Sequence, residues 1–369
     1  MPLRSVSRRA AAFGYGPNGA IFEIADPLPE PFWAHPANAW SPLIRSTIPG
    51  LDNVWLKYEG SHLSGSFKDR IMRASIAEIL ARDPDCPGVV VPSSGNAAVS
   101  AAALCAPRGL TMVAIVPDVV PVERLRPILA RGGIVIRAGE GPSQSYALAD
   151  RLSEQLGFAR LYSTFASPWA EWGCRSLGRE IASQMQGEVT QLISPVSAGP
   201  VLLGAANGLR EAGRNVPPLV AVQAAGCAPI ARAFFEGANH VTPWTDPVDT
   251  KAAAIADRLD GYAQDGTLVL DRVRQSGGSV AAVSDDQLAA ARAALLKHDG
   301  IDAEFSACAG VAHLMAHPDL ARSGTVCIIT ASGFKHTFAG DAPAADLDPV
   351  ALEKVQHFLT ATGTGTLLE

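Results

Sequence analysis

Four short segments carry residue types that could bind and activate a small anionic molecule. "SGSFKDR" (64–70) places one lysine, Lys68, where a helix is predicted to begin. "VPSSGNAA" (91–98) and "SPVSAGP" (194–200) each lead from a predicted strand through a turn of small residues into a predicted helix. "CIITASGFKH" (327–336) ends a strand at Thr330, and Ser332 follows. Each segment alone has an ordinary structural explanation, so the prediction depends on the four together.

The two strand–turn–helix segments predict two anion-binding sites. The first N–H groups of a helix have no intrahelical acceptor, and the helix dipole places partial positive charge there. Two such sites suit a ligand with a phosphate at one end and a carboxylate at the other. A lysine between them could attack an aldehyde. Pyridoxal phosphate bound to an amino acid has all three groups, and the fourth segment would face its pyridine nitrogen.

The elements that must position these segments alternate along the chain. Continuous apolar runs, typical of strands covered on both faces, occur at 88–92, 111–117, 133–137, 191–196, 218–224, 279–284 and 325–331. Helical patterns occur at 68–82, 143–157 and 285–298, the last preceded by a capping box of Ser284 and Gln287. This alternation predicts an α/β fold of two lobes, with mostly parallel sheets flanked by helices. Segments 26–50 and 237–278 are predicted to be surface loops.

Composition excludes several classes of protein. The 369 residues carry a net charge of −6, so no basic surface predicts nucleic-acid binding. No apolar run reaches the roughly 20 residues of a membrane span. The basic N-terminus, "MPLRSVSRRAAAFGYG", is too poor in apolar residues for a signal peptide, although a targeting segment stays an alternative. The six cysteines lack metal-binding spacing and predict buried free thiols, no metal site and a cytoplasmic location.

The order of the four segments resembles that of the fold-type II pyridoxal-phosphate enzymes, the tryptophan synthase β-like superfamily. The resemblance covers residues 38–335 and begins with "NAWSPLIRSTIPGLDNVWLKYEGSHLSGSFKDR". Within the family, "SGSFKDR", "SSGNAAVSAAA" and "TASGFKH" are most similar to threonine synthase. "DAEFSACAGVAHL" (302–314) is similar to the family's Glu-Pro-x-x-Ala helix start.

The resemblance implies a role for each matching residue. Lys68 would form the Schiff base with the cofactor and later move a proton, Phe67 would pack beside the cofactor, and Asn96 would hydrogen-bond its 3′-oxygen. Thr330, with Ser332 as the second choice, would face the pyridine nitrogen. The residues that would bind the cofactor phosphate are Ser197, Ala198, Gly199 and Val201. Those that would bind the substrate carboxylate are Ser93, Ser94, Gly95 and Ala97.

The resemblance also implies a domain division and a homodimer. Residues 1–87 and 166–369 would form the larger cofactor-binding domain, and residues 88–165 a smaller mobile domain. The ligand would lie at their junction, and the smaller domain would close over the substrate carboxylate.

The expected activity is that of a lyase or synthase of the threonine-synthase-like branch. It would catalyse elimination, or elimination and replacement, at Cβ or Cγ of an amino acid. The alternatives are β-replacement on an activated serine, serine/threonine deamination, an inactive ligand-binding homologue and a nucleotide-binding dehydrogenase. The dehydrogenase alternative is disfavoured because this sequence has no GxGxxG fingerprint after its first predicted strand.

Three positions depart from the family pattern. Ala97 stands where a larger side chain is usual, and Pro200 stands in the phosphate turn. Ala170 in "SPWAEWG" (167–173) stands where threonine synthases carry an arginine for the substrate phosphate. Trp169 and Trp172 beside it predict a less charged substrate and weak use of O-phosphohomoserine. Arg175 or Lys335 could otherwise supply the missing charge.

Overall fold

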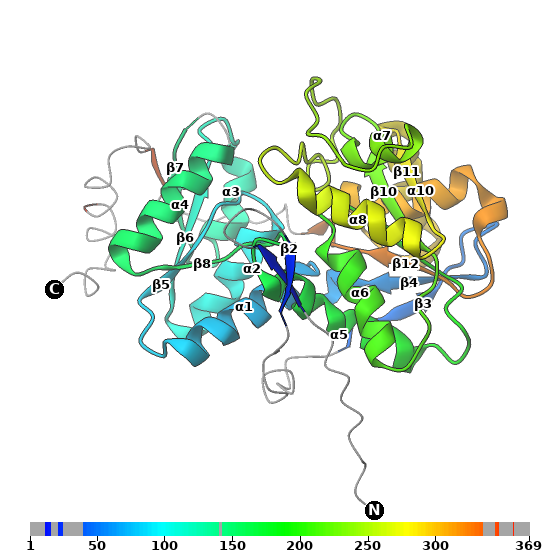
Figure 1. Cartoon of the computed structure of the whole chain (residues 1–369), viewed down its shortest axis with the longest axis horizontal. Coiled ribbons are helices and arrows are strands. Elements are labelled where there is room, and N and C mark those ends of the chain that lie inside the picture. The colour runs from blue at the N-terminus through cyan, green and yellow to red at the C-terminus, as the bar shows by residue number, and fades with distance from the viewer. Residues whose placement is uncertain are drawn as a thin grey trace, which may run out of the picture.

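The computed structural model describes residues 12–15, 21–24, 40–139, 142–334, 344–346 and 357. In this part of the chain, two largely parallel sheets flanked by helices form the two halves of the molecule (Figure 1). The predicted α/β class is therefore confirmed. The predictions for the basic N-terminus, for most of loop 26–50 and for Lys335 lie outside the described residues.

The larger sheet has the strand order β11-β10-β9-β12-β4-β3, and all neighbouring pairs are parallel except β3 with β4. β12 is buried along its whole length between helices, which explains its continuous apolar run. Four of these strands were predicted. The six strands are β3 (Leu43–Arg45), β4 (Val54–Tyr58), β9 (Gln191–Pro195), β10 (Leu219–Ala224), β11 (Ser279–Val283) and β12 (Thr325–Ile329).

The second sheet has the order β13-β7-β6-β5-β8, with parallel pairing throughout. Its strands are β5 (Gly88–Val91), β6 (Thr111–Val116), β7 (Ile134–Arg137), β8 (Ala159–Arg160) and β13 (Ala344–Asp346). The pairing of β13 with β7 places this strand in the second sheet, although the sequence division assigned it to the larger domain. A separate hairpin joins β1 (Ala12–Tyr15) to β2 (Ile21–Ile24).

Helices flank both sheets (Figure 1). The predicted helices at 68–82, 143–157 and 285–298 are present as α1, α4 and α9, and both hydrogen bonds of the Ser284–Gln287 capping box are made. The regular part of α9 ends at Ala294, and a π-helical turn follows to Asp299. The α-helices are α1 (Lys68–Arg82), α2 (Asn96–Cys105), α3 (Val122–Leu129), α4 (Pro142–Leu156), α5 (Pro168–Gln184), α6 (Pro200–Glu211), α7 (Pro229–Phe235), α8 (Ala263–Gln275), α9 (Asp285–Ala294) and α10 (Ala309–Ala316).

Helix α8 corrects the prediction of a surface loop over 237–278. Its buried positions, Val269, Leu270 and Val273, follow helical spacing, but Asp265 and Gly266 in its first turn are also buried. A Cβ on Gly266 would lie 2.6 Å from Leu259 Cδ1, so a larger residue here would force the Leu259 side chain to move. Glycine and aspartate both have low helix propensity, so propensity alone does not predict a helix that has them in its first turn.

Helices α5 and α6 pack closely because glycines face each other. A Cβ on Gly178 would lie 2.0 Å from the carbonyl oxygen of Ala205. A Cβ on Gly208 would lie 1.9 Å from the carbonyl oxygen of Arg175. This contact fixes α6, whose N-terminus follows the "SAGP" turn.

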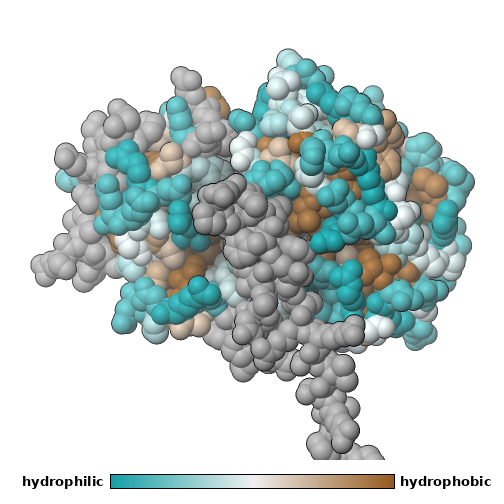
Figure 2. Space-filling model, viewed as in Figure 1, coloured by the Kyte–Doolittle hydropathy of each residue, from teal (hydrophilic) through white to brown (hydrophobic). Residues whose placement is uncertain are grey.

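Hydrophilic residues cover most of the face shown in Figure 2, with smaller apolar areas over both halves. No described helix is long and apolar enough to cross a membrane. All six cysteines are buried and free, as predicted.

Asp265 is a buried acid that ties α8 to the segment between the two sheets. Its Oδ2 accepts a hydrogen bond from the Phe165 N–H at 3.1 Å, and its Oδ1 has no partner among the described residues. Burial raises the pKa of Asp265 to about 7, although the Phe165 N–H opposes this effect. The folded protein therefore holds this proton more tightly than the unfolded chain does.

We expect the contribution of Asp265 to the free energy of unfolding to fall as the pH rises from about 4 to about 7, where the proton is lost. The contribution of Asp265 is at most about 4 kcal/mol. Asp265→Asn keeps the shape of the side chain but cannot ionise. The free energy of unfolding of this variant should therefore change less with pH, and at pH 8 it should exceed that of the wild type. Urea unfolding at pH 5 and pH 8 measures both proteins. An equal pH dependence in both would contradict the assignment.

Candidate active site

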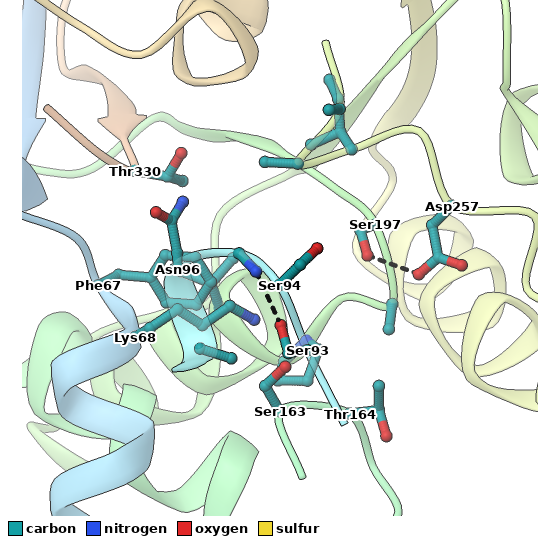
Figure 3. Close-up of a pocket in the computed structure, with 18 of the residues that line it drawn as sticks. Phe67, Lys68, Ser93, Ser94, Asn96, Ser163, Thr164, Ser197, Asp257 and Thr330 are labelled. Atoms are coloured by element: carbon teal, nitrogen blue, oxygen red, sulfur yellow. Dashed lines mark hydrogen bonds between the residues drawn. The ribbon is translucent and has the colours of Figure 1, made fainter. Parts of the chain in front are cut away.

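A cavity of about 280 Å³ brings the four segments together (Figure 3). Strand ends and helix starts from both halves of the molecule meet around it. The predicted site residues that line it are Phe67, Lys68, Ser93, Ser94, Gly95, Asn96, Ala97, Ser197, Ala198, Gly199, Val201 and Thr330. Among the predicted site residues, Ser332 alone does not line it.

Lys68 is the first residue of α1, and its side chain enters the cavity (Figure 3). The Phe67 N–H donates to the carbonyl oxygen of Thr330 at 3.0 Å and so fixes the helix start against the end of β12. Lys68 Nζ lies 4.7 Å from the centroid of the Phe67 ring. Burial lowers the pKa of Lys68 to about 8. At pH 7 roughly a tenth of the amine is then neutral and nucleophilic, far more than for an ordinary lysine.

The "SSGN" turn leads from β5 into α2. The Gly95 N–H donates to Ser93 Oγ at 3.2 Å, and Asn96 opens the helix. Asn96 Nδ2 donates to Glu304 Oε2 at 3.0 Å, across to the half of the molecule that contains the larger sheet. Glu304 also lines the cavity. It lies in the "DAEFSACAG" segment, which the sequence singled out without giving this residue a role.

The "SAGP" turn places the N-terminus of α6 at the cavity. Gly199 has a φ of 100°, in the left-handed region, and a Cβ there would lie 2.1 Å from Val269 Cγ2. Only glycine fits this position without strain. Pro200 occupies the first position of α6, where the missing N–H would have no intrahelical acceptor. The proline therefore suits the start of the helix, but it leaves one fewer N–H group to bind an anion there.

Thr330 and Ser332 differ in their surroundings. Thr330 lines the cavity directly after β12 (Figure 3). Ser332 is buried, and its Oγ accepts a hydrogen bond from the Phe334 N–H at 3.2 Å. The Ser332 N–H donates to the carbonyl oxygen of Gly65 at 2.8 Å, which ties this strand end to the lysine segment.

Besides Glu304, six polar residues of the cavity were not predicted from the sequence: Asp257, Tyr262, Tyr146, Arg124, Ser163 and Thr164. Asp257 Oδ2 accepts from Ser197 Oγ at 2.7 Å (Figure 3). The Tyr262 hydroxyl donates to Asp257 Oδ1 at 2.8 Å. Asp257 and Tyr262 belong to the predicted loop 237–278, where no motif marked them. Arg124 lies on α3, and no sequence motif around it indicates a role in binding.

The position of the missing substrate arginine, Ala170, and its alternative Arg175 both lie away from the cavity. Ala170 is fully buried on α5, and neither it nor Trp172 is among the described residues that line the cavity. Arg175 is fully buried and forms ion pairs with Glu171 and Glu211, each at 2.8 Å. The alternative in which Arg175 binds a substrate phosphate is therefore not supported, because Arg175 is not among the described residues that line the cavity. The reason given for weak use of O-phosphohomoserine also fails, because Ala170 and Trp172 do not line the cavity.

A buried charge network supports the helix that carries Lys68. Arg70 donates to both oxygens of Glu59 at 2.6 and 2.9 Å and to both oxygens of Glu180 at 2.6 and 2.8 Å. Lys57 Nζ pairs with Glu180 at 2.7 Å. The two cations and two carboxylates balance in a region that is almost entirely buried. The pKa of Glu59 is held well below its usual value by Arg70 and His62, which overcome the effect of burial.

Comparison with known proteins gives the same family as the site. A family model described as "Pyridoxal-phosphate dependent enzyme" matches residues 35–332. Threonine synthase of Methanosarcina acetivorans is 30% identical over 292 residues, which cover 76% of this chain and 70% of that protein. Threonine synthase of Methanocaldococcus jannaschii is 28% identical over 315 residues, which cover 82% and 75%.

Solved structures show the same fold. A threonine deaminase from T.th. has a TM-score of 0.68 at 20% identity and covers 83% of this chain and 94% of its own. Maize serine racemase has a TM-score of 0.68 at 18% identity and covers 88% and 94%. The family match spans most of the chain and includes all four segments that meet at the cavity. The chain therefore belongs to the pyridoxal-phosphate-dependent enzymes, and pyridoxal phosphate is its cofactor.

Proposed function

We propose that this enzyme is a lyase or synthase of the threonine-synthase-like branch, acting by elimination or by elimination and replacement at Cβ or Cγ of an amino acid. The observation that carries the proposal is one cavity with Lys68 between the N-termini of α2 and α6. The similarity to threonine synthases supports the same branch.

The residues around the cavity fit the cofactor. The turn that ends at the left-handed Gly199 places the N-terminus of α6 at the cavity, where its N–H groups can hold a phosphate. Lys68 offers an amine to the aldehyde, and Phe67 lies beside that amine. Thr330 offers a hydroxyl to the pyridine nitrogen, and Asn96 offers an amide to the 3′-oxygen. Both side chains point into the cavity (Figure 3).

The bound cofactor supplies an electron sink for the α-carbon of the substrate. Lys68, released from its covalent bond, then holds and moves the α-proton at Nζ. Its lowered pKa, about 8, suits a group that alternately accepts and returns a proton. A hydroxyl at Thr330 does not hold the ring nitrogen protonated as a carboxylate would. This favours elimination and replacement over reactions that need a protonated ring.

The two ends of the substrate would meet different parts of the cavity. Ser93, Ser94, Gly95 and Ala97 would bind the carboxylate through hydroxyls and the N–H groups at the start of α2. Arg124 supplies a cation on the same half of the molecule. Among the described lining residues, Lys68 and Arg124 are the basic side chains. Once Lys68 is occupied by the cofactor, Arg124 is left to bind an anionic leaving group.

We also propose a cytoplasmic homodimer, in which the half with the second sheet closes over the substrate. Six buried free thiols are in keeping with a reducing compartment. Closure would bring the Ser93–Ala97 turn, on that half, onto the carboxylate.

Arg124→Ala is expected to raise the KM for O-phosphohomoserine about 10-fold or more, because a phosphate would lose its charge-assisted donor. Turnover of O-acetylserine, which lacks that charge, should change little. Steady-state kinetics on O-phosphohomoserine, O-phosphoserine, O-acetylserine, serine and threonine measure both effects.

Arg126→Ala is the matched control, because Arg126 is exposed on the same helix and does not line the cavity. This variant should have the same kcat and KM as the wild type for all five substrates. Efficient O-acetylserine turnover without any O-phosphohomoserine activity would instead favour the β-replacement alternative. Release of ammonia from serine and threonine would favour the deaminase alternative.

A further inference from the structure

Asp257 places a carboxylate beside the turn proposed to bind the cofactor phosphate. Its Oδ2 accepts the Ser197 hydroxyl proton at 2.7 Å, so Ser197 Oγ presents its lone pairs, not its proton, to the rest of the cavity (Figure 3). Two further donors fix the carboxylate: the Leu259 N–H at 2.9 Å and the Tyr262 hydroxyl at 2.8 Å, both to Oδ1. The Asp257 carboxylate therefore acts as a hydrogen-bond acceptor in all three contacts.

The other charged and titratable groups around Asp257 come from several elements. They are Lys68 on α1, Tyr146 on α4, Cys227 after β10, and Arg258, Asp260 and Tyr262 on its own loop. Burial raises the pKa of Tyr146 to about 12 and that of Cys227 to about 11, and the pKa of Tyr262 is raised further. These three groups therefore stay neutral below pH 9. Lys68 is bound to the cofactor in the holoenzyme.

A phosphate at the "SAGP" turn would therefore meet an uncompensated charge. A free phosphate monoester carries nearly two negative charges at pH 7 and has a second pKa near 6. One hydroxyl, that of Ser197, would separate this dianion from the Asp257 carboxylate. Like charges at such a separation favour uptake of a proton.

We propose that Asp257 is a positioning residue that makes the enzyme bind the cofactor phosphate with one additional proton. The phosphate O–H donates to Ser197 Oγ, and the Ser197 O–H donates to Asp257 Oδ2. The proton comes from solvent on binding and returns to solvent on release, so no covalent bond changes. This inference rests on the proposed phosphate site. It implies that retention of the cofactor weakens up to about tenfold per pH unit between the second pKa of the free phosphate, near 6, and the higher midpoint of the bound phosphate.

Phosphorus NMR of the full-length holoenzyme between pH 5 and 9 tests the proposal. The resonance of the bound cofactor reports the ionisation of its phosphate directly, whatever the activity. In the wild type we expect a titration with a midpoint at least one pH unit above that of the free cofactor. In Asp257→Asn the amide can donate to Ser197 Oγ and carries no charge, so the midpoint should fall by at least one pH unit.

Asp260→Asn is the matched control, because Asp260 is an exposed acid on the same loop that does not line the cavity. Its midpoint should equal that of the wild type. A wild-type phosphate that stays a dianion over the whole range, or equal midpoints in the wild type and Asp257→Asn, would overturn the inference while leaving the proposed phosphate site intact. A bound-cofactor resonance that neither Asp257→Asn nor Ser197→Ala shifts would overturn the phosphate site itself.

Discussion

Lys68→Ala is expected to lower turnover by at least about 10³-fold, because the covalent attachment and the proton transfer at one nitrogen are both lost. The variant should still bind pyridoxal phosphate through the α6 N-terminus, but more weakly. Turnover is measured on the best substrate of the panel. Cofactor content is measured by absorbance after dialysis, which separates loss of chemistry from loss of binding.

Lys297→Ala is the control for this experiment, because Lys297 is an exposed lysine on the turn after α9. It should keep full activity and full cofactor content. A Lys68→Ala enzyme with more than about a tenth of wild-type turnover would remove Lys68 from the mechanism.

Arg70→Met should destabilise the protein by about 3–5 kcal/mol, the usual cost of leaving buried charges unpaired. The substitution keeps an apolar stem of similar length but leaves Glu59 and Glu180 facing each other with Lys57 as the remaining strong cation. Urea unfolding followed by circular dichroism measures the loss. Because Arg70 lies half a turn after Lys68 on α1, the folded fraction should also bind the cofactor less tightly.

Arg160→Met makes the same chemical change at an exposed ion pair. Arg160 pairs with Asp150 at 2.7 Å, and both side chains are almost half exposed. Such pairs contribute less than about 1 kcal/mol, so the midpoint of unfolding should hardly move. A similar loss in both variants would show that burial of the Arg70 network is not the cause.

The sequence predicted the fold well where burial gave continuous patterns. Seven apolar runs became strands, and α1 begins at Lys68 as predicted. Helix α8 was missed because Asp265 and Gly266 occupy its first turn. Gly266 packs against Leu259, and Asp265 accepts a hydrogen bond from the Phe165 N–H. Helix propensity does not include such contacts with other segments of the chain.

The candidate site was predictable as far as its motifs extend. Each of the two predicted turns follows a strand and precedes a helix, but β9 and β5 belong to different sheets, so the packing of the two halves brings the turns to one cavity. Asp257, Glu304 and Arg124 come from segments far apart in the sequence, and only the fold brings them to the cavity. The expectation that Ala170 stands beside the substrate failed for a related reason. The motif gave its position in the chain but not the direction in which its side chain would point.

Reduction of the holoenzyme with borohydride, followed by peptide mapping, tests the central claim most directly. Reduction fixes the pyridoxyl group permanently on the lysine that carries it. We expect the label on the peptide that contains Lys68, and no label after the same treatment of Lys68→Ala. A label on Lys57 or Lys251 in the wild type would contradict the assignment of the active site.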